Sequence, residues 1–404
     1  GDAMKRTVSS VSMALFAALV TVPLSARSEI YDPAETFSIQ NGNPNSVWAY
    51  GWMDTAFATF TLYVNAGFSS GVNPHWYGWG SNWTPSIWRN DANLTGICQP
   101  GWLHLHPGNG NQGSVLRWTA PRAGHCRAEG RFLPGDYGTM QVGVRHNTDW
   151  LWQATNAGAF TCEVDVVKGD VLDFTVYGGY SSGTTPLSVL IDGPSAPATR
   201  YVNAASATPV PPYLTPETAA ATIQDALAVA LDDDTVLVED GLYAVGGTAE
   251  SRIAVTNRVA VLSRNGPFRT TIQGGAGIRC ALLDGGAHLE GFTLTGGAPV
   301  AAGGGACVVS GTVARCRIMA NAAASGGGLW LADGSRAENC LVVSNTAAAD
   351  GGGVWFNNGG VLEHATVADN EAGGAGGGVC LNGGGTLRST IVYGNTAGSG
   401  ANWS

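Results

Sequence analysis

The peptide Gly326-Gly327-Gly328-Leu329-Trp330-Leu331 is followed, 25 residues later, by Gly351-Gly352-Gly353-Val354-Trp355-Phe356. Two more glycine triplets begin at Gly303 and Gly376, so consecutive triplets start 23, 25 and 25 residues apart. A second series has the same period, and each of its members follows an aliphatic residue by three positions: Asn321, Asn345, Asn370 and Asn395. Two independent series with one period indicate a stack of repeated structural units.

Aligning the repeats on these markers assigns side chains to faces, because a strand alternates its side chains between two faces. Three columns then face inward: Leu294, Ile318, Val342, Val367 and Val392; Phe292, Cys316, Cys340, Ala365 and Thr390; and Leu331, Phe356 and Leu381. With these residues inside, Trp330 and Trp355 face outward on adjacent repeats. The pattern predicts a right-handed parallel β-helix over residues 215–404. Asn395 completes a repeat and the sequence then stops at Ser404 without a capping element, so we expect this domain to be truncated there.

The asparagine series falls at a turn of each repeat. Asn tolerates the left-handed backbone conformation, and its amide can hydrogen-bond to its counterpart in the next repeat. We therefore predict that these four residues form a structural ladder. Cys316 and Cys340 stand one repeat apart, within reach of a disulfide bond, and two free buried thiols fit the pattern equally well.

The start of the coil requires a cover, since its first repeat leaves a strand edge and the core exposed. Thr215-Pro216 offers a helix start, and the spacing of Ile223, Leu227 and Leu231 predicts a short capping helix over 219–231. Residues 195–214 are expected to form a linker rich in Pro and Ala, with a short entry strand from Arg200 to Asn203.

The first half of the chain shows short alternating runs bounded by Gly, Pro and Asn, without a helical period between them. Runs of this kind predict an antiparallel β-sandwich or jelly roll over residues 27–194. The fold class is therefore all-β. Residues 1–26 read as a secretory signal peptide, with Met4-Lys5-Arg6 before an apolar run too short to span a bilayer.

The charge and composition of the chain limit the classes of molecule that it can bind. The formal net charge is −10, from 30 acidic and 20 basic residues, and no cluster of Lys and Arg occurs. A nucleic acid and an anionic membrane are therefore unsuitable partners, and we expect no membrane insertion. The eight cysteines and seven histidines show no metal-ligand spacing, so we predict neither a metal site nor a cofactor. A polysaccharide or cell-surface glycan fits better. The oligomeric state is left open by the sequence.

Both halves resemble known proteins. Ser46-Val47-Trp48, Leu105-His106-Pro107-Gly108 and Leu116-Arg117-Trp118-Thr119-Ala120-Pro121 resemble a domain of secreted bacterial multidomain proteins, which implies a carbohydrate-module-like sandwich. Asp240-Gly241-Leu242-Tyr243, Gly291-Phe292-Thr293-Leu294 and the glycine-triplet repeats resemble the pectate-lyase-like superfamily of β-helix proteins. The second resemblance implies a fold and little about activity, because lyases, hydrolases and adhesins share these coils.

Tryptophans are the candidate ligand contacts, because an exposed indole can stack on the apolar face of a sugar ring and donate a hydrogen bond. The first half places four of them in one Gly- and Asn-rich stretch: Trp76, Trp79, Trp83 and Trp88. The alternative is that they fill the sandwich core or anchor a loop. Trp330 and Trp355, with Asn357, Asn358 and Asp333 nearby, form a second candidate, and the alternative there is a ladder that only stiffens the sheet.

Catalysis on a β-helix would require paired or clustered carboxylates. Our alignment puts no two of the acidic residues at one phase of adjacent repeats: Glu290, Asp333, Glu338, Asp350, Glu363, Asp369 and Glu371. Arg336 and Arg388 then read as solvated surface charges, and we predict no catalytic residue in the chain. The sequence favours a secreted or surface polysaccharide-binding or adhesion protein. The alternatives are a polysaccharide lyase or glycoside hydrolase, and a structural spacer without a ligand.

Overall fold

The computed structural model describes residues 28–79, 83–92, 94, 98–135, 138–180 and 183–404. The expected signal peptide, residues 1–26, lies outside this range. The chain divides into two compact units, with the boundary between Ser195 and Ala196. Within the described residues no helix is long and apolar enough to cross a membrane.

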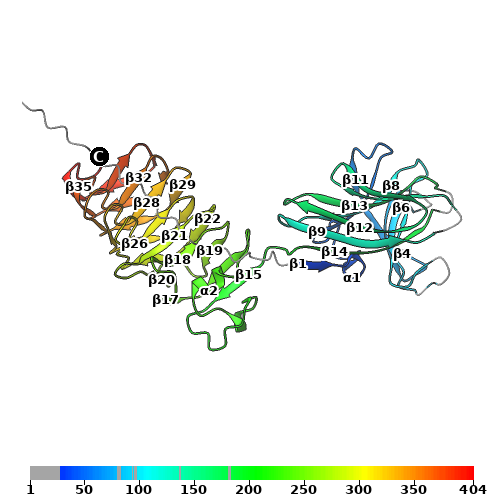
Figure 1. Cartoon of the computed structure of the whole chain (residues 1–404), viewed down its shortest axis with the longest axis horizontal. Coiled ribbons are helices and arrows are strands. Elements are labelled where there is room, and N and C mark those ends of the chain that lie inside the picture. The colour runs from blue at the N-terminus through cyan, green and yellow to red at the C-terminus, as the bar shows by residue number, and fades with distance from the viewer. Residues whose placement is uncertain (1–27, 80–82, 93, 95–97, 136–137, 181–182) are drawn as a thin grey trace, which may run out of the picture. The chain divides into compact units, whose positions relative to one another are not determined.

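The first unit is a sandwich of two antiparallel sheets (Figure 1). The larger sheet comprises β1 (Ser28–Tyr31), β4 (Asn65–Ser69), β5 (Asn73–Trp79), β6 (Thr84–Arg89), β7 (Leu103–His106), β9 (Gly124–Phe132), β12 (Gly158–Val166) and β14 (Thr185–Pro194). The smaller sheet comprises β2 (Trp48–Met53), β3 (Phe60–Leu62), β8 (Gly113–Thr119), β10 (Gln141–His146), β11 (Asp149–Thr155) and β13 (Val171–Tyr177). A four-residue helix, α1 (Pro33–Thr36), follows β1. Large aromatic side chains such as Trp48, Trp118 and Phe174 fill the core. The predicted antiparallel sandwich is confirmed.

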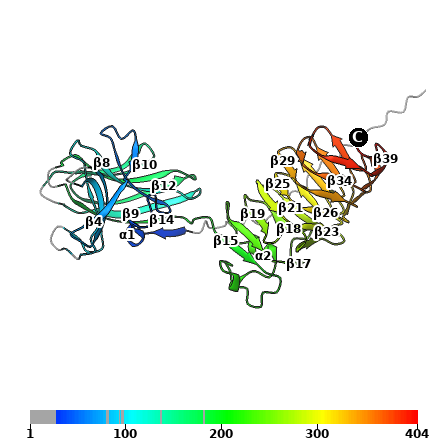
Figure 2. The same ribbon diagram turned by 180° about the vertical axis from the view of Figure 1, so that it is seen from behind.

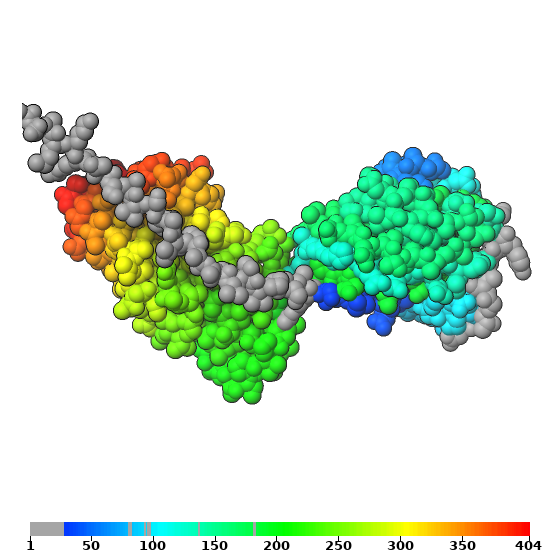
Figure 3. Space-filling model, viewed as in Figure 1, coloured from blue at the N-terminus to red at the C-terminus, as the bar shows by residue number. Residues whose placement is uncertain are grey.

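The second unit is a parallel β-helix of about seven turns. Figure 2 shows the same coil from behind. In the space-filling view its colours pass from green to red in chain order (Figure 3). Each complete turn contributes one strand to each of three sheets.

Sheet I contains β15 (Thr199–Val202), β16 (Thr235–Val238), β19 (Ala260–Ser263), β22 (Ala287–Glu290), β25 (Gly311–Ala314), β29 (Ser335–Glu338), β33 (Val361–Glu363) and β37 (Thr386–Arg388). Sheet II contains β17 (Gly241–Tyr243), β20 (Thr270–Gln273), β23 (Thr293–Thr295), β26 (Arg317–Met319), β30 (Leu341–Val343), β34 (Thr366–Ala368) and β38 (Ile391–Tyr393). Sheet III contains β18 (Ser251–Val255), β21 (Arg279–Leu283), β24 (Ala306–Val308), β28 (Leu329–Ala332), β32 (Val354–Asn357) and β36 (Val379–Asn382). A short sheet IV contains β27 (Ala322–Ala323), β31 (Thr346–Ala347), β35 (Glu371–Ala375) and β39 (Thr396–Ser399).

Strand register reproduces the columns expected from the period. The aliphatic column runs in order through Leu294, Ile318, Val342, Val367 and Val392. The first four of these side chains are fully buried. Cys316 and Cys340 are both buried and form no disulfide bond. Burial raises the pKa of the Cys316 thiol to about 12, so this thiol stays protonated at neutral pH.

The predicted capping helix is present but much shorter than expected. α2 spans Ile223–Leu227, and a single 3-10 turn, η1 (Pro216–Thr218), precedes it. The expected extent of 219–231 is wrong because Ala220 bridges in parallel to Val202, which holds the chain extended there. The Thr222 hydroxyl then accepts from the Asp225 N–H and starts the helix. Ile223 and Leu227 nevertheless bury their side chains in the core, as a cap requires.

A buried ion pair fixes the same end of the coil. Arg200 on β15 donates through Nε and Nη2 to one oxygen of Asp234, at 2.9 and 2.6 Å. Asp234 also accepts from the backbone N–H groups of Ala198 and Leu231. Both charged side chains are almost completely buried, so neither charge has water to stabilise it.

The four asparagines are brought together as a hydrogen-bonded column. The side-chain amide of Asn321 donates to the Oδ1 of Asn345 at 3.0 Å, and Asn345 donates to Asn370 at 3.0 Å. Asn370 donates to Asn395 at 2.9 Å, and each of the three accepting Oδ1 atoms also accepts the backbone N–H of the preceding member. Every member of the column is therefore tied to its neighbours by side-chain and backbone groups.

Replacing Asn345 with Ala is expected to lower the free energy of unfolding of the β-helix by about 1–3 kcal/mol, because buried partners in two neighbouring turns lose a hydrogen bond. Chemical denaturation of the purified chain measures this loss. Asn382→Ala is the control, since this asparagine is exposed on β36, outside the column. Unchanged stability with loss of a bound ligand would instead make the ladder a binding feature.

Candidate functional site

Two indoles lie side by side on the outer face of sheet III. Trp330 and Trp355 are register partners on β28 and β32, and the residues that flank them in sequence are fully buried. Their ring centroids are 5.9 Å apart with an angle of 26° between the planes. Both side chains are half-buried. The outward placement expected from the sequence is therefore present in the structure.

Small and polar side chains surround this pair. The same outward column continues to Cys307 on one side and to Cys380 on the other. Asn357 and Asn382, two residues further along their strands, are register partners on the same face. The pair is therefore an aromatic surface with amide groups beside it and no large side chain above or below it in the column.

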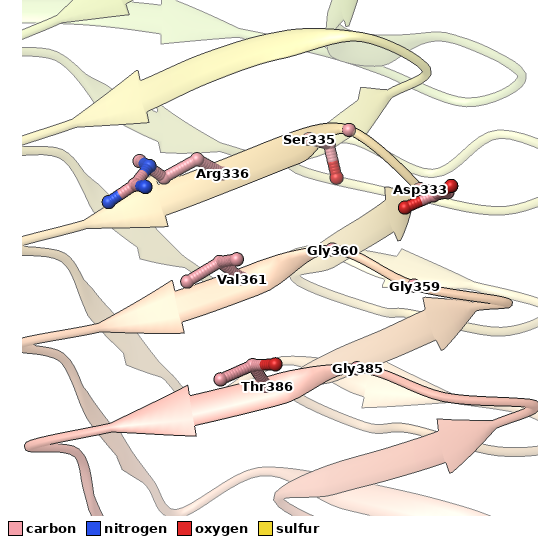
Figure 4. Close-up of a pocket in the computed structure, with 9 residues that line it drawn as sticks. Asp333, Ser335, Arg336, Gly359, Gly360, Val361, Gly385 and Thr386 are labelled. Carbon is pink, nitrogen blue, oxygen red and sulfur yellow. The ribbon is translucent and has the colours of Figure 1, made fainter.

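A pocket of about 390 Å³ lies where the strands of sheet III turn into sheet I. Asp333, Ser335 and Arg336 line it from one turn of the coil, Gly359, Gly360 and Val361 from the next, and Gly385 and Thr386 from the third. Figure 4 shows Asp333 and Arg336 at opposite ends, with the Ser335 hydroxyl between them. We call this feature the corner pocket.

Glycine is required at the floor of the corner pocket. A Cβ at Gly359, whose φ is +157°, would lie 2.7 Å from Oδ1 of Asp333. A Cβ at Gly360 would lie 2.9 Å from the Ala332 carbonyl oxygen, and one at Gly385 would lie 2.6 Å from the Phe356 ring. The turns therefore pass close over one another, and they leave a floor of backbone without side chains.

Two acidic residues on sheet I contradict the prediction that no two carboxylates share a phase on adjacent repeats. Glu338 and Glu363 are register partners on β29 and β33, so two carboxylates do stand at one phase of adjacent turns. Each lies 12 positions after the first glycine of its triplet. The repeat period alone could therefore have predicted this pairing of Glu338 with Glu363, and the prediction that no two acidic residues share a phase is wrong.

Arg336 lies within ion-pair distance of both carboxylates. Its Nη1 donates to Oε1 of Glu363 and lies 3.8 Å from Oε2 of Glu338. Arg388 is the register partner of Glu363 on the following turn. Arg336, Glu338 and Glu363 thus form an ion-pair network at the surface, and among the described residues the exposed Arg388 side chain makes no ion pair. Within the described residues no group of three or more His, Cys, Asp or Glu is placed to hold a metal ion.

The four sandwich tryptophans do not form one site. Trp76 is buried, with its Nε1 donating to the Ser38 carbonyl oxygen at 2.9 Å. Its inclusion among the sugar contacts is wrong, because alternation along β5 turns this ring into the core. Trp88 is half-buried and stacks on the His104 ring with centroids 4.3 Å apart. Burial lowers the pKa of His104 to about 4, so the imidazole is neutral.

Trp79 and Trp83, near the tip of the β5–β6 hairpin, keep 40% and 37% of their surface exposed. Trp79 meets Trp52 edge to face, and Trp83 lies parallel to Tyr77 with ring centroids 4.9 Å apart. These two residues remain candidates for a ligand contact in the sandwich.

No protein-family model matches this chain, and no curated protein does. Solved structures similar to it include the catalytic unit of a GH87 alpha-1,3-glucanase from Streptomyces thermodiastaticus, at 15% identity and a TM-score of 0.25. That match covers 74% of this chain and 63% of the glucanase unit. The CBM35 of Abf62 from Cellvibrio japonicus is similar at 17% identity and a TM-score of 0.19, over 26% of this chain and 80% of the module.

Proposed function

We propose that this chain binds a polysaccharide on the outer surface of its β-helix, through Trp330, Trp355 and the corner pocket. The observation that carries the proposal is the register of the two indoles, which places half-exposed rings on the strands that lead directly into the pocket. The proposal includes an extracellular or cell-surface location, which the apolar segment in residues 1–26 supports.

Chemistry at this surface suits a sugar polymer. Aromatic rings contact the apolar faces of pyranoses, while indole N–H groups and carboxamides hydrogen-bond to hydroxyls. Trp330 precedes Asp333 by three residues, about 10 Å of extended chain, so one oligosaccharide several residues long can contact both features. The uncharged glycine floor would accept the flat face of a ring.

Replacing both Trp330 and Trp355 with Ala is expected to weaken glycan binding about tenfold or more, since each stacked ring contributes on the order of 1 kcal/mol. Isothermal titration measures the affinity, and thermal melting of the same protein measures stability. Phe268→Ala is the control, because this ring is 80% exposed and lies outside the site. A fall in melting temperature with unchanged affinity would show that the pair only stiffens the sheet.

The same titration on the double variant Trp79→Ala, Trp83→Ala shows which of the two units binds the glycan. If this change removes binding and the β-helix change does not, the sandwich carries the ligand. Both changes leave the cores intact, because all four rings are partly exposed.

One observation favours glycoside hydrolysis as a second candidate function. Glu338 and Glu363 stand on adjacent turns, whose strands are about 4.8 Å apart, and retaining glycosidases hold two carboxyl groups about 5–5.5 Å apart. The contact of Arg336 with both carboxylates weighs against it, because the general acid must carry a proton. Release of reducing sugar that disappears in Glu363→Gln would establish hydrolysis instead.

A further inference from the structure

The charge that the corner pocket offers to a ligand is negative. Asp333 is exposed and makes no ion pair or side-chain hydrogen bond with any other described residue. Arg336, at the other end, is occupied by Glu363 and Glu338. Among the residues that line the pocket, Asp333 and Arg336 are the charged ones, so Asp333 carries the charge that no ion pair compensates.

Geometry places the unpaired carboxylate where a ligand would meet it. The Asp333 side chain lies against the backbone of Gly359 on the next turn, at the open end of the glycine floor (Figure 4). The Ser335 hydroxyl already donates to the Ala332 carbonyl oxygen at 2.6 Å. Asp333 is therefore the charged acceptor that remains available in the pocket.

We infer that the corner pocket selects a polysaccharide whose sugar rings carry free amino groups, an inference that rests on the proposed function. A protonated amino group has three N–H donors and a positive charge, both of which complement the Asp333 carboxylate. A uronic acid polymer has the wrong charge for this position. Its carboxylate would face Asp333 and could reach Arg336 only by displacing Glu363. The pocket volume of about 390 Å³ lies within the range of small-ligand sites.

Three probes of one length test the inference on the full chain: glucosamine hexamer, its N-acetylated counterpart and oligogalacturonate, at a pH that protonates the amino groups. We expect the glucosamine hexamer to bind about tenfold more tightly than the acetylated one, because a hydrogen bond to a charged group contributes about 1.5 kcal/mol or more. Oligogalacturonate should bind most weakly. Raising the salt concentration should reduce the preference.

Asp333→Asn should abolish the preference for the glucosamine hexamer and leave the affinity for the acetylated hexamer unchanged. Glu371→Gln is the matched control, because it removes one exposed carboxylate outside the pocket and should keep the preference. Equal or tighter binding of the acetylated hexamer, or a preference that survives Asp333→Asn, overturns the inference and leaves the proposed function standing. No binding of any of the three probes overturns the inference as well, and the proposed function then depends on other polysaccharides.

Discussion

Val342→Asp is expected to destabilise the β-helix by about 3–5 kcal/mol, the cost of a buried charge without a partner. Val342 is fully buried, between Ile318 and Val367 of the adjacent turns. Both neighbours are aliphatic, so the new carboxylate would find no hydrogen-bond donor among the side chains of its column. Chemical denaturation followed by circular dichroism measures the change in the free energy of unfolding.

Val343→Asp is the matched control for this prediction. Val343 is the next residue of β30, and it points to the outer face of sheet II, where it is only half-buried. We expect this change to cost less than about 1 kcal/mol, as surface substitutions usually do. Equal losses from the two variants, or an unchanged stability of Val342→Asp, would show that the assignment of inner and outer faces is wrong.

Arg200→Met is expected to cost about 3–5 kcal/mol, because it leaves the Asp234 carboxylate buried without its counter-charge. The loss should be localised to the N-terminal end of the β-helix, where Arg200 and Asp234 join β15 to the chain before β16. Hydrogen exchange of the amides in β15 and β16 would report local opening, and denaturation would report the total loss.

A double variant separates the charge from the packing. Arg200→Met combined with Asp234→Asn removes both charges, and the amide oxygen keeps an acceptor for one of the two N–H groups, of Ala198 and Leu231, that bind different oxygens of Asp234. We expect it to recover more than half of the stability lost in the single variant. A single variant as stable as the parent would show that the ion pair does not hold this end of the coil.

The sequence predicted the β-helix core well because the repeat period constrains it. A period of about 25 residues fixes which side chains stack from turn to turn, and the alternation of strands then separates Val342 from Val343 and Trp330 from its neighbours. The asparagine column followed from the same arithmetic. These features need only local regularity, which the sequence shows directly.

Features that depend on non-local contacts could not be predicted in this way. The helix expected over 219–231 is shortened by a bridge from Ala220 to β15, which helical spacing does not reveal. The burial of Trp76 depends on which face of β5 meets the smaller sheet, and four closely spaced tryptophans do not indicate it. The corner pocket is formed by three consecutive turns, so Asp333, Gly359 and Gly385 come together although each is about one repeat from the next in the sequence.

The pairing of Glu338 with Glu363 is a different case. It followed from the period, since both residues hold the same place after a glycine triplet, and only the comparison of acidic residues across repeats was wrong. What the sequence could not show is that Arg336 lies within ion-pair distance of both carboxylates. Because Arg336 contacts both carboxylates, we interpret the two glutamates as partners in an ion-pair network rather than as catalytic acids.

A glycan array with the unchanged chain and the Trp330→Ala, Trp355→Ala variant side by side tests the central claim most directly. We predict that the unchanged chain is retained on at least one polysaccharide and that the double variant, whose circular dichroism spectrum shows that it is folded, loses this retention. Retention of both proteins to the same extent, or of neither on any polysaccharide, would contradict polysaccharide binding by the outer surface of the β-helix.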